Sequence, residues 1–246
     1  MQQIITVFAQ KHQLTTLEVM GEIERFFSAT LSHWYGIEVM VFFREDLQLE
    51  AVAYNKHGGV VRQRVIDLTT ISGFNSLKKQ LEAGLAKAAL LKQTRCYKYH
   101  EQELRWGEIT SRDSQNNLYV ETEVFPDEKI TAVCPLNRIG VHERNTKAFS
   151  IGTRRAFHLR RIEPVLLNGT PRLNVVVDRV SKTLVETLLK EHLGSSAEAF
   201  RIRCVKRYVG HKSFVLTSRR LPKSAIISVT RELGEKMEVK FLEHLQ

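Results

Sequence analysis

The chain has 246 residues, of which 43% are hydrophobic and 26% charged, a composition typical of a globular protein with one large domain or two to three small ones. Lys and Arg outnumber Asp and Glu by 37 to 27. The excess grows along the chain, from 12 against 11 in residues 1–104 to 12 against 9 in residues 105–180 and 13 against 7 in residues 181–246. We interpret this gradient as a local surface for a polyanion, although a solvated basic face gives the same counts.

The cysteines and the apolar runs indicate the compartment. Cys96, Cys134 and Cys204 are odd in number and far apart, which disfavours a disulfide framework and a zinc site and favours a reducing, cytoplasmic location. The longest mostly apolar run, residues 37–43, is far shorter than the roughly 20 residues of a membrane span. We therefore expect no membrane segment, and no signal peptide is evident at the N-terminus.

Residues 1–104 are predicted to form one α+β domain. Apolar residues at helical spacing predict a helix over residues 3–34, with a break near residues 13–16 where Thr15 or Thr16 is a candidate N-cap followed by Glu18. The period then changes to two, which predicts strands, and afterwards returns to a long connecting helix. The strands are expected at residues 37–43, 49–54 and 60–68, and the connecting helix at residues 74–103.

Residues 105–180 are predicted to form a small closed β-barrel, for which the OB-fold is the commonest five-stranded choice. On one strand, Phe157, Leu159 and Ile162 fit the inward face. Alternation then leaves Arg154, His158 and Arg160 pointing outward. The five short strands are expected at residues 104–111, 117–124, 130–134, 154–162 and 172–177.

Residues 181–246 are predicted to form a small α+β sandwich. A helix at residues 224–233 ends at Gly234, and Met237, Val239 and Phe241 alternate as the buried face of a strand. Just before this helix lies a basic turn with Arg219, Arg220 and Lys223. Amide groups and the dipole at a helix N-terminus favour phosphate, so this turn predicts a nucleic-acid contact. The other expected elements are a helix at residues 181–193 and strands at residues 200–206 and 214–218.

Taken in order, these segments resemble the NusA family of bacterial transcription termination and antitermination factors over about 230 residues. Each motif is weak alone, and the order and spacing carry the resemblance. The matching stretches are Lys11-His12-Gln13-Leu14, then Glu18 to Trp34-Tyr35-Gly36, Trp106-Gly107-Glu108-Ile109, Cys134-Pro135-Leu136-Asn137-Arg138, Ile151-Gly152-Thr153, Val175-Val176-Val177-Asp178-Arg179-Val180 and Arg231-Glu232-Leu233-Gly234-Glu235-Lys236.

The resemblance implies three domains: an N-terminal polymerase-binding domain (residues 1–104), an OB-fold barrel (105–180) and a type II KH domain (181–246). In this family a Gly-x-x-Gly loop of the KH domain grips the RNA backbone. Arg220-Leu221-Pro222-Lys223 occupies that loop here, so both glycines are missing. The loop either binds phosphate through side-chain charge or is structural. A second KH domain is absent from the sequence, and the N-terminal head is shortened, which is typical of a compact paralogue.

Several side chains of the barrel and of the third segment are candidate RNA contacts. OB-folds stack bases on aromatic rings and follow the backbone with cations. Tyr119 is a candidate stacking residue, although a tyrosine at the edge of the core fits as well. Arg138, His142 and Arg144 lie in a loop beside the barrel, where a solvated loop is the alternative. The full set is Tyr119, Arg138, His142, Arg144, Arg154, His158, Arg160, Arg201, Arg203, Arg219, Arg220 and Lys223.

The sequence favours a binding protein over an enzyme, because it carries no nucleotide-binding, hydrolase or metalloprotease motif. We expect no catalytic residue, metal or cofactor, and a monomer. The leading hypothesis is a NusA-like factor that binds RNA polymerase through residues 1–104 and nascent RNA through the rest, and so modulates pausing, termination or antitermination. The alternatives are a stand-alone RNA-binding protein or chaperone, an interaction scaffold and, more distantly, a nuclease.

Overall fold

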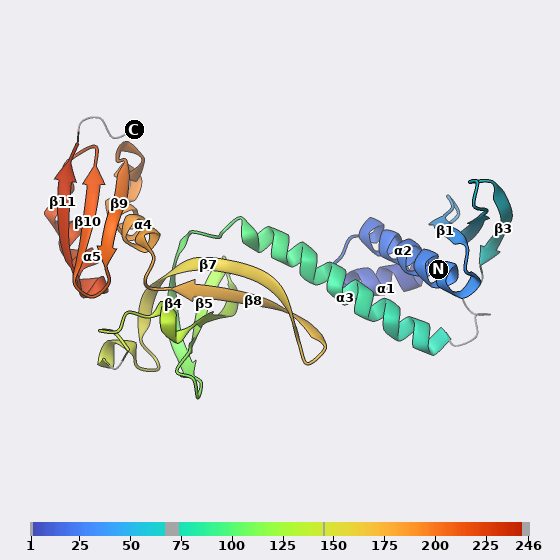
Figure 1. The fold of residues 1–246 in the computed structure, drawn as a ribbon, viewed down its shortest axis with the longest axis horizontal. Helices are drawn as coiled ribbons and strands as arrows, with labels where there is room; N and C mark the ends of the chain where they lie inside the picture. The colour runs from blue at the N-terminus through green and yellow to red at the C-terminus, as the bar shows by residue number, and fades with distance from the viewer. Residues whose placement is uncertain (1, 67–73, 145, 243–246) are drawn as a thin grey trace. The chain divides into compact units, whose positions relative to one another are not determined.

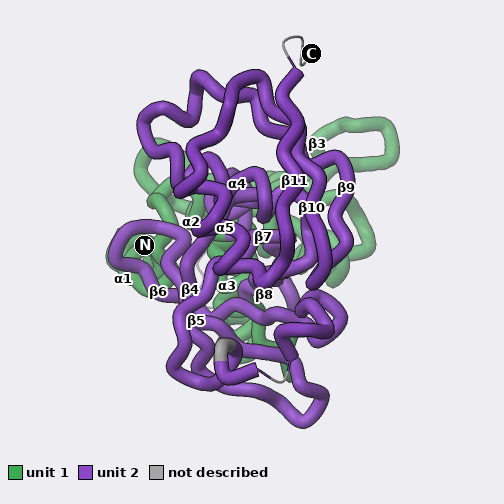
Figure 2. The backbone as a smooth tube through the Cα atoms, turned by 90° about the vertical axis from the view of Figure 1, so that its left-hand side faces the viewer, with its two compact units in different colours: residues 1–93, 166–172 green, residues 94–165, 173–246 purple. Residues whose placement is uncertain are grey.

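The computed structural model of the chain describes residues 2–66, 74–144 and 146–242 (Figure 1). The chain divides into two compact units, residues 1–93 with 166–172 and residues 94–165 with 173–246 (Figure 2). The described ranges hold five α-helices and three sheets, so the α+β prediction is confirmed. The domain boundaries near residues 104 and 180 stay predictions. Within these ranges no helix combines the length and apolar character needed to cross a membrane.

Unit 1 is built from helices and a three-stranded antiparallel sheet of order β1-β2-β3. The predicted break between the first two helices is confirmed. Thr15 caps the second of them in a capping box, because its side chain accepts from the Glu18 amide while the Glu18 carboxylate accepts from the Thr15 amide. The elements are α1 (Gln2–His12), α2 (Thr16–Tyr35), β1 (Glu38–Phe43), β2 (Leu49–Tyr54), β3 (Val60–Ile66) and α3 (Phe74–Lys98). The predicted end of the third strand, Leu68, lies outside the described residues.

The core of unit 1 forms where α1, α2 and α3 meet the inner face of the sheet. Ile5, Val19, Ile23 and Leu85 are each no more than 1% exposed. The helical spacing of Val19 and Ile23 in α2 and of Leu85 in α3 is part of the pattern that predicted these two helices.

Helix α3 ends five residues before the predicted end at residue 103. The Gln102 backbone has a φ of 74°, a left-handed value that cannot continue a helix. The His100 amide instead donates to the Tyr97 carbonyl, and the Gln102 amide donates to the carbonyl of Leu159 in the barrel. The pattern of apolar residues ends gradually here, so it did not reveal this turn.

The first part of unit 2 is a closed barrel of five strands in the order β4-β5-β6-β8-β7, which confirms the predicted five-stranded barrel. β4 closes the ring by pairing antiparallel with β7, and Val133 of β6 pairs in parallel with Val176 of β8. β7 extends beyond its predicted end at residue 162. Pro164 does not end the strand, because it lacks only its own backbone N–H donor and its fixed φ suits an extended chain. The strands are β4 (Leu104–Arg112), β5 (Leu118–Phe125), β6 (Glu128–Cys134), β7 (Arg154–Leu167) and β8 (Thr170–Asp178), with the short helices η2 (Leu136–Arg138) and η3 (Lys147–Phe149) between β6 and β7.

The second part of unit 2 is a three-stranded sheet of order β11-β10-β9 with two helices on one face (Figure 1). β10 pairs antiparallel with β9 and parallel with β11, and α5 supplies the crossover between the parallel strands. Gly234 ends α5 in the left-handed conformation, as predicted. Phe241 lies on the same face as Met237 and Val239, as predicted, because it pairs with the buried Thr217, but at the end of the strand it is 46% exposed. The elements are α4 (Lys182–Leu193), η4 (Gly194–Ala199), β9 (Ile202–Tyr208), β10 (Lys212–Thr217), α5 (Lys223–Leu233) and β11 (Lys236–Phe241).

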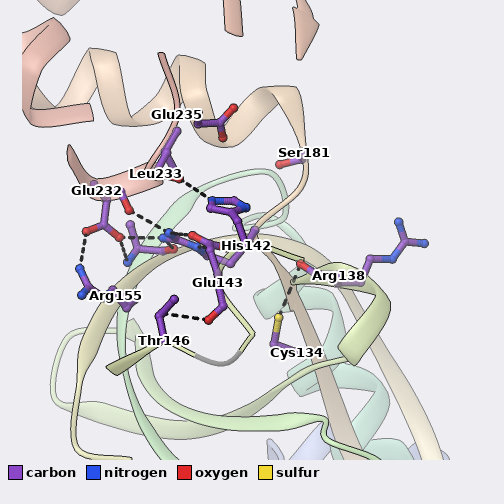
Figure 3. Close-up of polar contacts among 12 residues, drawn as sticks. Cys134, Arg138, His142, Glu143, Thr146, Arg155, Ser181, Glu232, Leu233 and Glu235 are labelled. Carbon is purple, nitrogen blue, oxygen red and sulfur yellow. Dashed lines mark hydrogen bonds and ion pairs between the residues drawn. The ribbon is translucent and has the colours of Figure 1, made fainter. Parts of the chain in front are cut away.

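A fully buried arginine, Arg179, joins the two parts of unit 2. Its two acidic partners, Glu143 and Glu232, are labelled in Figure 3. Arg179 follows β8, and its guanidinium ion pairs with Glu143 of the loop before η3 and with Glu232 of α5, the latter at 2.7 Å. It also donates to the carbonyls of Ala156 at 2.6 Å and of Glu232 at 3.0 Å. The guanidinium lies 5.0 Å from the centre of the Phe149 ring. Burial alone would lower the pKa of Arg179, but the two carboxylates outweigh it and raise the pKa.

Replacing Arg179 by Met tests this arrangement. We expect the free energy of unfolding to fall by about 3–5 kcal/mol, because the change leaves two carboxylates buried without a cation. Chemical denaturation at neutral pH measures the loss. Arg154→Met, which removes an exposed arginine from β7, is the matched control and should change stability by about 0.5 kcal/mol or less. A near-neutral result for Arg179→Met would contradict the structural role assigned to this residue.

Candidate nucleic-acid interface

A groove lies on the barrel where β6, β7 and β8 meet the start of α4, and its volume is about 680 Å³. Because three arginines line it, we call it the basic groove. It combines the outer surface of three barrel strands with η2 and the N-terminus of a twelve-residue helix. Its lining residues are Gln102, Val133, Pro135, Asn137, Arg138, His158, Arg160, Arg161, Asn174, Val176, Ser181 and Thr183.

Three arginines supply the charge of the basic groove. Arg160 is 41% exposed and lies 3.4 Å from Asp178, and Arg161 is 62% exposed and lies 3.1 Å from Glu163. Arg138 is half-buried, and Figure 3 shows its side chain extended away from the buried contacts. Among the described residues no acidic partner is found for its guanidinium. Arg138 is therefore the cation of the groove that is most available to an incoming phosphate.

His158 lies on the outer face of β7, opposite Phe157 and Leu159, as predicted, but it forms the floor of the basic groove and is covered from solvent. It is 2% exposed, with Nδ1 at 3.3 Å from the Asp178 carboxylate and Nε2 at 3.2 Å from Gln102 Oε1. Strand β7 is covered on both faces at this point, because residues 156–159 are all buried. Simple alternation could not reveal this, since it assumes that one face is open to water.

Asp178 connects the floor of the groove to helix α4. Its carboxylate accepts from the Ser181 amide at 2.9 Å, and Ser181 in turn caps α4 by accepting from the Leu184 amide. Burial would raise the pKa of Asp178, but the hydrogen bond and charge of His158 and the bond from Ser181 outweigh it and lower the pKa to about 2. The site therefore keeps one buried negative charge beneath a ring of exposed positive ones.

Tyr119 extends the surface of the basic groove onto β5. It lies directly opposite Val133 in the antiparallel β5–β6 pair, so the two side chains share one face of the sheet. Its neighbours Leu118 and Val120 are fully buried, which places the half-buried tyrosine on the outer side of the barrel. A ring in this position can stack on a base whose phosphates lie in the groove.

His142 and Arg144 serve the contact between the barrel loop and the C-terminal part. His142 Nε2 donates to the Leu233 carbonyl at 3.0 Å, since a carbonyl can only accept. A Cβ at Gly210 would collide with the His142 ring, and Gly210 has a φ of 78°, so only glycine suits that position. Arg144 donates to the Ile139 carbonyl at 3.3 Å. The structure thus ties both side chains to the protein itself.

The basic turn before α5 is a second cationic surface. Arg219, Arg220 and Lys223 are exposed, and the Thr217 hydroxyl holds the turn by donating to the Arg219 carbonyl at 2.8 Å. Pro222 occupies the N-cap of α5, and no side chain accepts a hydrogen bond from the first backbone amides of the helix. The turn thus presents cations and a helix N-terminus together, as the sequence predicted.

The remaining predicted cations lie on the surface of unit 2. Arg154, at the start of β7, is exposed, as are Arg201 and Arg203 beside and within β9. Ile202 and Cys204, which alternate with them, are buried, so the two arginines lie on the opposite face of the strand. The sequence reasoning missed several polar residues of the basic groove, because only the fold brings their segments together: Gln102, Asn137, Arg161, Asn174, Ser181 and Thr183.

Comparison with known proteins gives no assignment for this chain. No protein-family model matches it, and no curated protein matches it significantly. The assignment of a function therefore rests on the resemblance and on the geometry described above.

Asp178→Asn tests the charge at the groove floor. The folded-state pKa lies below the ordinary value of about 3.9, so the carboxylate stabilises the fold at neutral pH and loses this contribution as the pH falls from about 4 toward 2. We expect the free energy of unfolding of the variant to be about 2 kcal/mol lower than that of wild type at pH 7. Below pH 4 the variant should lose less stability than wild type. Denaturation across that pH range measures both. Equal acid sensitivity of variant and wild type would contradict the assignment.

Proposed function

We propose that this chain is an RNA-binding transcription factor similar to NusA. In this proposal residues 1–104 bind RNA polymerase and unit 2 holds nascent RNA. By binding both, the protein modulates elongation, pausing, termination or antitermination. The observation that carries the proposal is the basic groove, where Arg138, Arg160 and Arg161 surround a cavity of about 680 Å³ on a five-stranded barrel. A phosphate backbone fits this combination of concave shape and exposed guanidinium groups.

The topology of unit 2 supports the finer fold assignments. A five-stranded closed barrel of order β4-β5-β6-β8-β7 supports the OB-fold, a common platform for single-stranded nucleic acid. The order α4-β9-β10-α5-β11, with its basic turn before α5, supports a type II KH-like domain. Because Arg220 and Lys223 replace the glycines of the KH loop, we infer that this turn contacts phosphate through side-chain charge.

The surface of unit 1 supports a protein partner for that unit. An apolar groove of about 380 Å³ lies among α1, α2 and α3 and includes Ile4, Val7 and Leu77 in its lining. Val7 is 59% exposed and Ile4 42% exposed, although both lie beside a well-packed core. An exposed apolar groove rimmed by charged residues such as Lys11 and Glu82 is typical of a site for a protein segment. We assign this groove to RNA polymerase.

RNA binding is tested with Arg138→Ala combined with Arg160→Ala. We expect full-length protein to bind single-stranded RNA with an affinity that falls steeply with salt, because phosphate contacts release counterions. Removing two such contacts should reduce the slope of log affinity against log salt by about 1.4. Fluorescence anisotropy over a salt series measures the slope. Arg62→Ala with Arg64→Ala, two exposed arginines of β3, is the charge-matched control and should leave the slope unchanged. Absence of RNA binding at low salt would contradict the proposal.

Polymerase binding is tested with Val7→Glu, which places a charge in the apolar groove. We expect the full-length variant to lose retention of core RNA polymerase in co-purification, because burying an unpaired carboxylate at an interface is costly. Leu17→Glu, at an apolar residue that is 79% exposed and outside the groove, is the control and should retain polymerase. If the wild type binds RNA but never retains polymerase, the stand-alone RNA-binding protein replaces the transcription factor.

A further inference from the structure

The outer face of the sheet β9-β10-β11 carries cations and aromatic rings side by side. α4 and α5 lie on the other face: in Figure 1 the sheet faces the viewer, and in Figure 2 both helices lie to the left of the strands. Ser213, Val215 and Cys204 point toward the helices and are buried. Their neighbours along each strand therefore point outward.

The strand pairing places the outward residues in rows across the sheet. Tyr208 lies opposite Lys212, and Lys206 lies opposite Phe214 in the antiparallel β9–β10 pair. The next row joins Arg203 to Leu216, and β11 adds Lys236, Glu238 and Lys240 on the same face. Of the described residues on this face, five are cations and one is a carboxylate. We call it the open sheet face.

The two rings of the open sheet face hold ammonium groups against them. Lys206 Nζ lies 4.6 Å from the centre of the Tyr208 ring, and Lys212 Nζ lies 4.9 Å from the centre of the Phe214 ring. The ring centres are 6.2 Å apart. Tyr208 is 47% exposed, and Lys206 is exposed beside it, so the ring is accessible to a ligand.

We propose that the open sheet face binds single-stranded RNA by stacking a base on Tyr208 while the surrounding lysines and Arg203 contact the phosphates. Exposed rings among cations are what sequence-tolerant single-strand binders use, since every base has a face that can stack. The excess of positive charge fits the RNA backbone. Lys212 is paired with Glu238 at 2.6 Å, whereas Lys206 has no carboxylate partner among the described residues and can move to a phosphate as a base takes its place over Tyr208. This inference rests on the proposed function and adds an RNA surface separate from the basic groove and the basic turn.

The test compares Tyr208→Ala with wild type in the full-length protein, using two labelled probes of about 12 nucleotides. One probe is oligouridylate, and the other is a ribose-phosphate chain of the same length without bases. We expect Tyr208→Ala to weaken binding of oligouridylate roughly tenfold and to leave binding of the abasic probe unchanged. Tyr208→Phe, which keeps a ring, should bind both probes like wild type. Tyr99→Ala removes a tyrosine that is 86% exposed outside this sheet and is the matched control.

The outcomes separate this inference from the proposed function. Wild-type affinity of Tyr208→Ala for oligouridylate, or an equal loss on both probes, would overturn stacking on the open sheet face. If the paired Arg138 and Arg160 variant still weakens binding in that case, RNA binding at the basic groove stands alone. If wild type binds neither probe at low salt, the inference and the proposed function both fail.

Discussion

The burial of Arg179 is the constraint on which unit 2 depends. A guanidinium at 0% exposure is tolerable only because Glu143 and Glu232 approach it from two different segments and backbone carbonyls take its remaining donors. Since one carboxylate comes from the barrel loop and the other from α5, the charge balance fixes both segments against the end of β8. A second buried pair, Arg207 with Glu235, anchors β9 in the same way and reaches the Ser181 carbonyl at 2.6 Å.

These buried ion pairs determine which charged side chains stay exposed and can contact a partner. Glu143, Glu232 and Glu235 are used by buried arginines, and Asp178 is held beneath the basic groove by His158 and Ser181. These four carboxylates of unit 2 thus point into the protein, although Asp178 also pairs with the exposed Arg160. The basic groove, the basic turn and the open sheet face are the surfaces that result, and a polyanion is the common partner that their charge favours.

The fold followed closely from the sequence, whereas the site followed only in part. Helical spacing, the Thr15 cap and Gly234 marked most elements to within a few residues, because these signals are local. The burial of His158 was not predicted, because it depends on Asp178 and Gln102, which lie 20 and 56 residues away. Tyr208 and Phe214 were not recognised as one surface, since their proximity depends on the pairing of β9 with β10, and Tyr208 lies beyond the predicted end of its strand at residue 206. That Arg138 has no acidic partner among residues 2–66, 74–144 and 146–242 likewise depends on the three-dimensional fold.

Photo-cross-linking of full-length protein to RNA that contains 4-thiouridine identifies the peptides that contact RNA without any substitution. We expect cross-links in residues 133–138 and 158–161, which contribute to the lining of the basic groove. Competition with excess unlabelled single-stranded RNA should remove them. Cross-links confined to residues 1–93, or none above the level of an unrelated basic protein, would contradict the claim that unit 2 holds the RNA.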